Sequence, residues 1–295
     1  MPSLTTSAEP ELTFNAHLGE GPVWDENEEK LYWVDILSAK LLVYDPSRKT
    51  NMEYDTGEHV GAVALRKPGG LLLALKTGIA FFDLESRKLT RILDPEPGLS
   101  GNRFNDGKCD PSGRFWAGTL SYKQVKGAGS LYILFPDLHA ERKLREVTVP
   151  NGMAWNHDNN QFFFIDSPTG TIFTFDYDDK SGMISNRRTV RQIAEAEGSP
   201  DGMTIDEEDG LWVALYGSGK VIRIDPESGD TLHEIHLPVP NVTSCTFGGP
   251  GLDELYITTA RENMSALDIK QAPLSGSLFK AKVPCKGLPV SRFSG

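Results

Sequence analysis

Four polar residues that each precede a short apolar stretch could carry chemistry in this 295-residue chain: Glu20, Asn105, Asn151 and Asp201. Two carboxylates and two amides that met in a confined space would repel one another or stay unsatisfied unless a cation lay between them. Oxygen ligands without histidine or cysteine favour a hard divalent ion such as Ca²⁺ or Mg²⁺, with Mn²⁺ or Zn²⁺ as substitutes. Whether these residues meet depends on the elements that carry them.

The four residues occupy one position of a repeated phrase. In its clearest copy, residues 199–215, an apolar strand follows Asp201, a turn contains Asp206, and a second strand begins at Leu211. Two β-prone runs separated by acidic residues and glycine indicate a hairpin. The same spacing recurs from Glu20, Asn105 and Asn151 and, more weakly, from Val60 and Ser244. The six copies begin about 40 to 50 residues apart, which is the spacing of a structural repeat.

Two further apolar runs follow the hairpin, for example residues 40–44 and 220–224, each before an Asp-Pro turn. Four strands in about 40 to 50 residues is the period of a propeller blade. We therefore predict an all-β, six-bladed β-propeller with four-stranded antiparallel blades, formed by one domain over residues 1–295. Residues 12–17 are expected to pair with the last blade near residues 279–283 and close the ring.

The first strand of each blade lines the central channel of a propeller, so equivalent positions converge on one axis. This geometry predicts a metal site in the channel. The simpler alternative is that Asp and Asn before Gly only cap turns. Four such residues in register favour the metal site over that alternative.

Composition is that of a globular protein, with 39% hydrophobic and 24% charged residues. A net charge of −11 argues against binding nucleic acid or an anionic membrane through the general surface. The N-terminus shows no secretory signal, no run has the length of a membrane-spanning helix, and the three cysteines are widely spaced. We expect a cytoplasmic protein, either a monomer or a weak homo-oligomer, with Cys109 and Cys245 as buried thiols.

The sequence resembles the senescence-marker-protein, gluconolactonase and luciferin-regenerating-enzyme family in four phrases: LGEGPVWDENEEKLYWVDI (18–36), NRFNDGKCDPSGRFWAGT (102–119), PNGMAWN (150–156) and PDGMTIDEEDGLWVA (200–214). Likeness in residues 184–188 and 240–261 extends the match over nearly the whole chain. The resemblance implies one divalent metal in the channel, with Glu20, Asn151 and Asp201 as ligands and Ca²⁺ as the favoured ion. It also implies that Arg103 and Asn105 contact substrate.

One position departs from the family. Animal members carry an acidic, sugar-contacting residue after the Gly-Thr of the third blade, where this chain reads GTLSYKQVKG with Lys123 near the corresponding place. We retain Lys123 as a substrate-binding candidate, but the sugar specificity of that subgroup does not carry over.

The resemblance implies a metal-dependent lactonase that opens a sugar (aldono) lactone to the aldonic acid. The metal would act as a Lewis acid on the lactone carbonyl. The attacking water would lose its proton to Asp201, or the metal itself would lower the pKa of that water. Three other functions stay open: a calcium-binding regulator without catalysis, a hydrolase of a phosphotriester, another ester or a luciferin-related compound, and a protein-interaction propeller.

Overall fold

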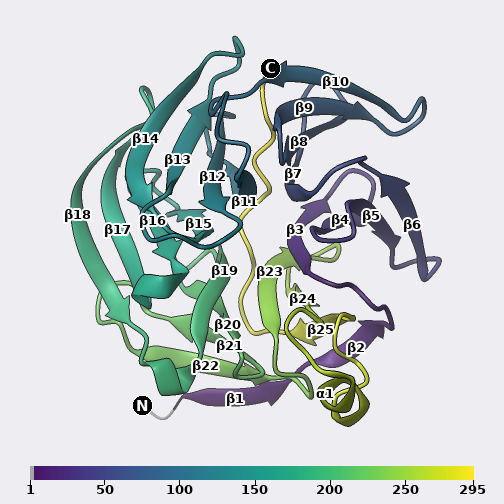
Figure 1. The fold of residues 1–295 in the computed structure, drawn as a ribbon. Coiled ribbons are helices and arrows are strands. Elements are labelled where there is room, and N and C mark those ends of the chain that lie inside the picture. Colours follow the sequence, from purple (N-terminus) through teal and green to yellow (C-terminus); the bar gives the residue numbers. More distant parts are fainter. Residues whose placement is uncertain (1–2) are drawn as a thin grey trace.

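Six β-sheets are arranged as blades around a central channel (Figure 1). The computed structural model describes residues 3–295. Within each blade, strands that follow one another in the chain are antiparallel neighbours, and the first strand lies innermost, against the first strands of the adjacent blades. This arrangement confirms the predicted all-β, six-bladed propeller with four-stranded blades.

Four blades are formed entirely by consecutive strands. They are β3 (Gly19–Asp25), β4 (Lys30–Asp35), β5 (Lys40–Asp45) and β6 (Thr50–Asp55); β7 (Val60–Leu65), β8 (Leu71–Leu75), β9 (Gly78–Asp83) and β10 (Lys88–Leu93); β11 (Asn102–Cys109), β12 (Phe115–Ser121), β13 (Gly129–Leu134) and β14 (Ala140–Val147); and β15 (Pro150–Trp155), β16 (Gln161–Asp166), β17 (Thr171–Asp178) and β18 (Met183–Gln192).

The N-terminal segment completes the last two blades. The fifth blade contains β19 (Ser199–Ile205), β20 (Leu211–Tyr216), β21 (Lys220–Ile224) and β22 (Thr231–His236), and β1 (Leu4–Ser7) adds a parallel fifth strand to it. The sixth contains β23 (Val242–Gly248), β24 (Glu254–Thr259) and β25 (Leu278–Lys282), with β2 (Glu9–Leu12) as its outer strand.

The ring closes on the expected blade but through an earlier segment. Residues 9–12 pair with β25, whereas the prediction placed the pairing at residues 12–17. The carboxylate of Asp35 accepts hydrogen bonds from the backbone N–H groups of His17 and Leu18, at 2.8 and 3.0 Å. This contact holds the latter part of the predicted segment at the start of the first blade instead.

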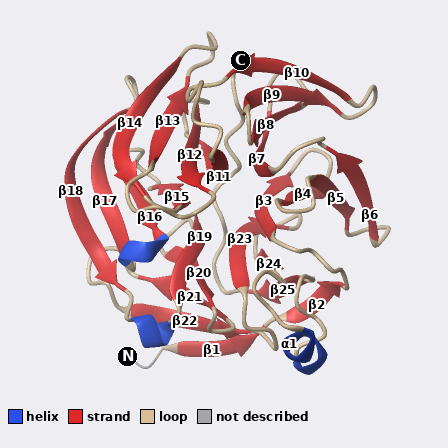
Figure 2. Ribbon diagram, viewed as in Figure 1, coloured by secondary structure: helices blue, strands red, loops and turns tan. Residues whose placement is uncertain are grey.

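Helical structure within residues 3–295 is limited to η1 (Ser167–Thr169), η2 (Glu195–Glu197) and α1 (Ala266–Gln271) (Figure 2). No helix in this part of the chain has the length and apolar character needed to cross a membrane.

The hydrophobic core is divided among the interfaces between neighbouring blades, each with its own cluster of buried side chains. Between the third and fourth blades, for example, Trp116 packs against Trp155 and Phe162 with ring centroids 5.8 and 5.0 Å away. The apolar strands therefore hold the blades together from both faces. All three cysteines are buried free thiols, as predicted for Cys109 and Cys245.

The residue five positions after a channel residue closes the turn between the first and second strands. The Oδ1 atoms of Asp110 and Asp206 each accept a hydrogen bond at 2.9 Å from the backbone N–H four residues later. Oδ1 of Asn156 accepts hydrogen bonds from the backbone N–H groups of residues 160 and 161. A short polar side chain that bonds to its own backbone in this way specifies a turn. Much of the repeated sequence pattern is therefore explained by the residues that form this turn.

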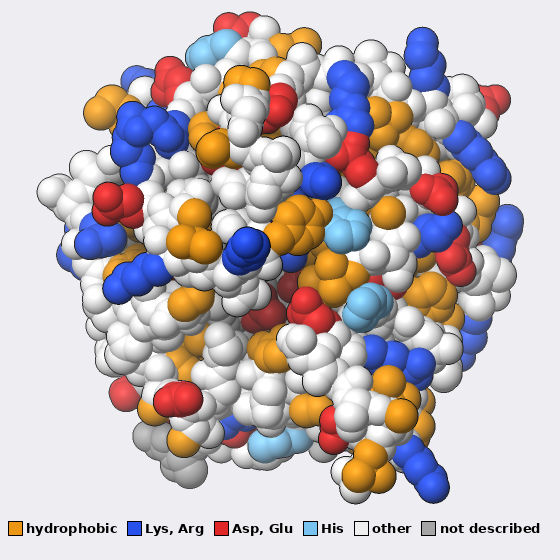
Figure 3. Space-filling view, viewed as in Figure 1, with side chains coloured by type: hydrophobic (Ala, Val, Ile, Leu, Met, Phe, Trp, Pro, Cys, Tyr) orange, Lys and Arg blue, Asp and Glu red, His pale blue; other side chains and the backbone are white. Residues whose placement is uncertain are grey.

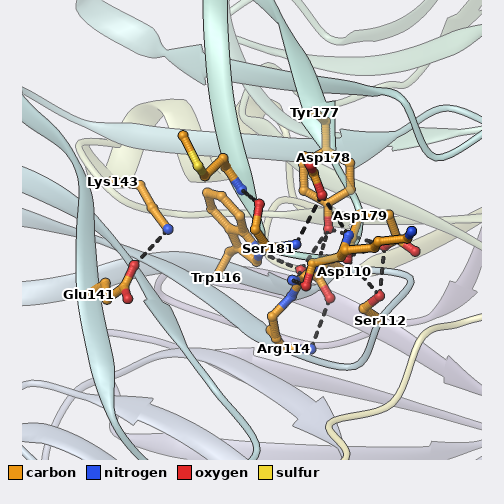
Figure 4. A network of polar contacts seen from close by, with 12 residues as sticks. Asp110, Ser112, Arg114, Trp116, Glu141, Lys143, Tyr177, Asp178, Asp179 and Ser181 are labelled. Carbon is orange, nitrogen blue, oxygen red and sulfur yellow. Dashed lines mark hydrogen bonds and ion pairs between the residues drawn. The ribbon is translucent and has the colours of Figure 1, made fainter.

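In the third blade this turn residue also anchors a buried network (Figure 4). Oδ2 of Asp110 accepts hydrogen bonds from Nε of Arg114 at 2.6 Å, from the Trp116 indole at 2.9 Å and from the Tyr177 hydroxyl at 2.8 Å. Tyr177 belongs to the fourth blade, so the network fastens two blades together. In the fifth blade, Asp206 makes the corresponding contacts to the Trp212 indole and Arg223.

The C-terminal segment crosses the end of the channel opposite Glu20 and Asp201, and Figure 1 shows it as the yellow trace through the centre. Its backbone bonds to several blades in turn, through the pairs Glu207 N–Lys286 O, Gly287 N–Leu252 O, Phe293 N–Leu65 O and Ser294 N–Gly113 O. The segment therefore ties the blades together and covers this mouth of the channel.

Replacing Asp110 by Asn should lower the free energy of unfolding by about 3 kcal/mol, because it breaks a buried ion pair and leaves Arg114 with only the longer, 3.6 Å contact to the Asp179 carboxylate. Urea denaturation of both proteins measures the difference. Asp158→Asn, in the exposed turn after β15, is the matched control and should change stability by less than about 0.5 kcal/mol. Equal losses in the two variants would contradict a special role for the network.

Candidate functional site

Each innermost strand is irregular at the position that faces the channel. The register against the second strand shifts between Glu20 and Val23 in β3, between Asn151 and Met153 in β15, and between Pro200 and Met203 in β19. The innermost strands of the other three blades shift at the corresponding place. A β-bulge bends its strand and re-aims a side chain. The bulges thus explain how the repeated polar residues come to line one cavity.

Glycine after the polar residue is required by the close approach of neighbouring inner strands. A Cβ atom on Gly152 would lie 2.7 Å from Cβ of Met203, and one on Gly202 would lie 2.1 Å from Oγ of Ser244. Any larger residue would push these strands apart. The polar-Gly pair is therefore a packing requirement as well as a turn signal.

Amide side chains from the third and fourth blades form a continuous hydrogen-bonded chain. Arg103 Nη1 donates to Asn105 Oδ1 at 2.8 Å, and Asn105 Nδ2 donates to Asn151 Oδ1 at 3.0 Å. Asn151 Nδ2 then donates to Ser167 Oγ at 2.8 Å, and the Ser167 hydroxyl donates to Pro200 O at 2.6 Å. The chain fixes the orientation of both amides, so each presents its carbonyl oxygen in a defined direction.

The two carboxylates predicted as ligands are buried on the first and fifth blades. Glu20 is 4% exposed and Asp201 is 9% exposed, and each accepts a hydrogen bond from the backbone N–H of the following glycine. Burial, reinforced by the nearby Asp106 carboxylate, raises the pKa of Glu20 to about 8. Burial and the charge of Glu20 raise the pKa of Asp201 well above its usual range. Without a cation between them, both groups favour the protonated, neutral form, because Arg103 offsets the charge of Glu20 only in part.

Glu20, Arg103, Asn105, Asn151 and Asp201 line a single cavity of about 250 Å³. The space-filling view shows this mouth of the channel as a hollow with acidic side chains at its bottom (Figure 3). The structure thus brings together every predicted site residue except Lys123. Lys123 is exposed in the turn after β12, and its neighbour Gln124 lines the cavity instead. Contact of Lys123 with a substrate stays a prediction.

Several lining residues were not found from the sequence. They are Ser167, Pro168, Tyr216, Glu262 and Asn263, which follow the second strands of their blades or end them. Tyr216 donates a hydrogen bond from its hydroxyl to Glu262 O at 3.1 Å, and Asn241 Nδ2 donates to the same oxygen at 3.0 Å. The repeat gives these positions no common residue type. Their shared place, in the connections after the second strands, was the only signal that could have found them.

The donor set fits a hard divalent cation. Among residues 3–295, no group of three or more His, Cys, Asp or Glu side chains is placed to hold a metal. The set here combines two carboxylates with the amide oxygen of Asn151, which is oxygen-only chemistry of the kind that Ca²⁺ and Mg²⁺ prefer. Two buried carboxylates without a paired cation are costly, and an ion between them would remove that cost.

Without metal, the raised pKa of Glu20 should make the protein less stable as the pH increases. Between the ordinary glutamate pKa of 4.5 and about 8, the folded state binds more protons than the unfolded state. Its stabilisation is complete below pH 4.5 and is lost as the pH rises through the folded pKa. Asp201 acts in the same direction.

Urea denaturation in EDTA across this pH interval should show the decline, and Glu20→Gln should flatten it. Glu53→Gln, which removes an exposed carboxylate of β6, should leave the slope unchanged. A stability that is constant or rises with pH in EDTA would contradict the electrostatics described for the channel.

Comparison with known proteins identifies relatives along nearly the whole chain. The chain is 39% identical over 290 residues to regucalcin of Bos taurus, covering 96% of this chain and 97% of that protein. It is also 39% identical over 285 residues to YvrE of Bacillus subtilis, whose name designates it a candidate sugar lactone lactonase, with coverage of 97% and 98%.

A solved structure of a calcium-binding protein, regucalcin of Agrobacterium tumefaciens, superimposes with a TM-score of 0.95 at 25% identity and covers all of both chains. Residues 18–261 match the family described as the SMP-30/gluconolactonase/LRE-like region. A match over most of the chain, together with relatives close to 40% identical along nearly their full length, shows that this protein belongs to the SMP-30/gluconolactonase/LRE-like family.

Proposed function

We propose that this protein hydrolyses a sugar lactone, an aldonolactone, with the help of one divalent ion bound by Glu20, Asn151 and Asp201. The observation that carries the proposal is the meeting of two unpaired buried carboxylates and an oriented amide oxygen in one cavity. Membership of a family whose relatives include a named sugar lactone lactonase supports the reaction class.

Different groups at the cavity wall would carry out different parts of the lactone hydrolysis. When bound, a divalent ion supplies Lewis acidity toward the lactone carbonyl oxygen. In this proposal Asp201 accepts the proton of the attacking water on a carboxylate oxygen and returns it to the ring oxygen when the carbon–oxygen bond breaks. Water adds, the ester bond opens, and the product is the hydroxy acid.

Arg103 and Asn105 position the substrate. Asn105 is held between Arg103 and Asn151, so its side chain is ordered before a substrate arrives. Both Nδ2 protons of Asn105 are engaged, by Pro150 O and Asn151 Oδ1, so Asn105 would offer a substrate hydroxyl only its Oδ1 as acceptor. A preorganised group of this kind raises the rate by fixing the reacting groups in a productive geometry. Ser167, which orders Asn151 from the other side, supports the same arrangement.

One rival function has a specific observation in its favour. The solved regucalcin structure from Agrobacterium tumefaciens is described as that of a calcium-binding protein. An oxygen-only site could hold Ca²⁺ without turning over any substrate. Hydrolysis of lactones separates this alternative from the proposal, because only an enzyme would open the ring above the spontaneous rate.

Asp201→Asn should keep an oxygen ligand while it removes the base. Turnover at saturating metal should fall by about 10²–10⁴, the usual contribution of general base catalysis. The measurement is lactone opening followed at fixed pH against the uncatalysed rate. Asp230→Asn, on an exposed turn of the same blade, should keep wild-type turnover. If the wild-type protein opens no sugar lactone above background with any of Ca²⁺, Zn²⁺, Mn²⁺ or Mg²⁺, the enzymatic proposal fails and the calcium-binding alternative replaces it.

Divalent metal should stabilise the folded protein, because a ligand that binds only the native state adds about 2.7 kcal/mol at a free concentration 100 times its Kd. The melting temperature should therefore rise with metal and return to its original value with EDTA. Asn151→Ala and Asp201→Ala should lose most of this rise, whereas Asn263→Ala, elsewhere on the cavity wall, should retain it. Melting curves that are identical with and without metal would refute the site.

A further inference from the structure

Positive and negative side chains occupy different sides of the cavity mouth. The acidic side is formed by Glu20 of β3, Asp201 of β19 and Glu262 after β24, which belong to three adjacent blades. The basic side is formed by Arg103 of β11 and Lys76 after β8, on the second and third blades. In Figure 3, acidic side chains lie within the hollow and at its edge, and basic and histidine side chains lie above and beside it. The mouth is therefore electrically asymmetric.

Arg103 is buried on the basic side without a carboxylate in direct contact, and the Glu20 and Glu262 carboxylates act on its charge only from a distance. Its side chain is 7% exposed, and it forms no ion pair within residues 3–295. Nη1 donates to Phe104 O at 2.9 Å and to Asn105 Oδ1 at 2.8 Å, while Nε has no hydrogen-bond partner. A buried cation without an anionic partner is costly. An anion delivered by a ligand would satisfy it.

A tyrosine links the basic residues at the rim. The Tyr122 ring lies 5.9 Å from the guanidinium carbon of Arg103 and 5.7 Å from Nζ of Lys76. Its hydroxyl is 2.8 Å from Nδ1 of His59. Burial and the charges of Arg103 and Lys76 lower the pKa of His59, which favours its neutral form. The positive charge at the rim is therefore that of Arg103 and Lys76, and the Tyr122 ring lies near both.

Two glutamates near this basic side, Glu96 and Glu58, are already engaged. Glu96 accepts hydrogen bonds from Asn102 at 2.9 Å, Thr119 at 2.8 Å and Tyr132 at 3.1 Å. Glu58 pairs with Arg91 and accepts hydrogen bonds from Thr77. These contacts hold both carboxylates away from Arg103. The positive side of the mouth is therefore available to a ligand.

We propose that the substrate is a lactone that carries a carboxylate at the end remote from its ring carbonyl. This inference rests on the proposed lactonase function and specifies its substrate class. The lactone carbonyl lies over Glu20, Asn151 and Asp201, and the remote carboxylate meets Arg103, with Lys76 adding long-range attraction. A guanidinium and a carboxylate match in charge and geometry. A lactone of a sugar diacid has this arrangement, whereas a simple aldonolactone ends in a hydroxyl.

A different role for Arg103 makes the opposite prediction. If the guanidinium served only to offset the negative charge of the channel, its removal would impair all lactones equally. If it binds a carboxylate, its removal abolishes the preference for carboxylated lactones and affects neutral ones less. The two roles are separated by comparing substrates that differ only in the terminal group.

The experiment compares D-glucono-γ-lactone with the D-glucaro lactone of the same ring size, which has a carboxylate in place of the terminal hydroxymethyl group. Wild-type kcat/KM should favour the carboxylated lactone by roughly 10- to 100-fold, the range for a hydrogen bond to a charged group. Raising the salt concentration should increase KM for that lactone alone, because screening weakens charge attraction. Arg103→Gln should remove the preference, mainly through KM, and Lys76→Gln should reduce it by a smaller factor.

Arg145→Gln is the matched control, because it removes an equal charge from the exposed outer strand β14 of the same blade, and it should keep the preference. A wild-type preference for the neutral lactone, or equal losses on both lactones in Arg103→Gln, would overturn the carboxylate assignment and leave the lactonase proposal standing. A phosphorylated lactone that is preferred over the carboxylated one would also overturn it. If neither lactone opens above background, the proposed function itself fails.

Discussion

In the blades that carry Glu20, Asn105, Asn151 and Asp201, the innermost strand has to satisfy two demands at one position. It must stay hydrogen-bonded to the second strand of its blade, and it must present a polar side chain to a channel that five other inner strands also line. The bulges at Glu20, Asn151 and Asp201 meet both demands by inserting extra backbone where the side chain turns inward. Glycines 152 and 202 then allow neighbouring strands to approach within contact distance. The geometry of the cavity depends on this local irregularity.

Turn chemistry at the other end of the hairpins keeps that irregular strand in place. Asp110 and Asp206 each bond to their own turn, to a buried indole and to an arginine. A buried polar network of this kind is rigid when all its members are satisfied. The hairpins are therefore held in a fixed register. The side chains that line the cavity are positioned more precisely than side chains on loops would be.

The sequence was sufficient for the propeller and for the channel residues because both depend on strict spacing. Glu20, Asn105, Asn151 and Asp201 occupy equivalent positions of the repeat. Equivalent positions of propeller blades lie at the same level around the channel. Ser167, Tyr216 and Glu262 were missed because they belong to connections after the second strands, where the six repeats share no residue type. The basic side of the mouth was missed for a related reason: Tyr122, His59 and Lys76 lie on separate connections and meet only in the folded chain. The closing strand was predicted too far along the chain. The hydrogen bonds from the backbone of residues 17 and 18 to the Asp35 carboxylate could not be predicted from the repeat.

Charge explains why such a site can hold both an ion and an anionic substrate. Glu20, Asp106 and Asp201 bring three carboxylates into the channel, and Lys108 lies near Asp106 with its Nζ donating to Met203 O at 2.7 Å. A divalent ion between Glu20 and Asp201 would bring this inner group close to neutrality together with Lys108. The guanidinium of Arg103 would then carry positive charge on the side of the mouth that Tyr122 occupies, while the Glu262 carboxylate lies on the other side. A neutral floor beside Arg103 would attract an anionic lactone to that side, whereas the same floor without the ion would repel it. Binding of metal and binding of substrate would therefore reinforce each other through electrostatics.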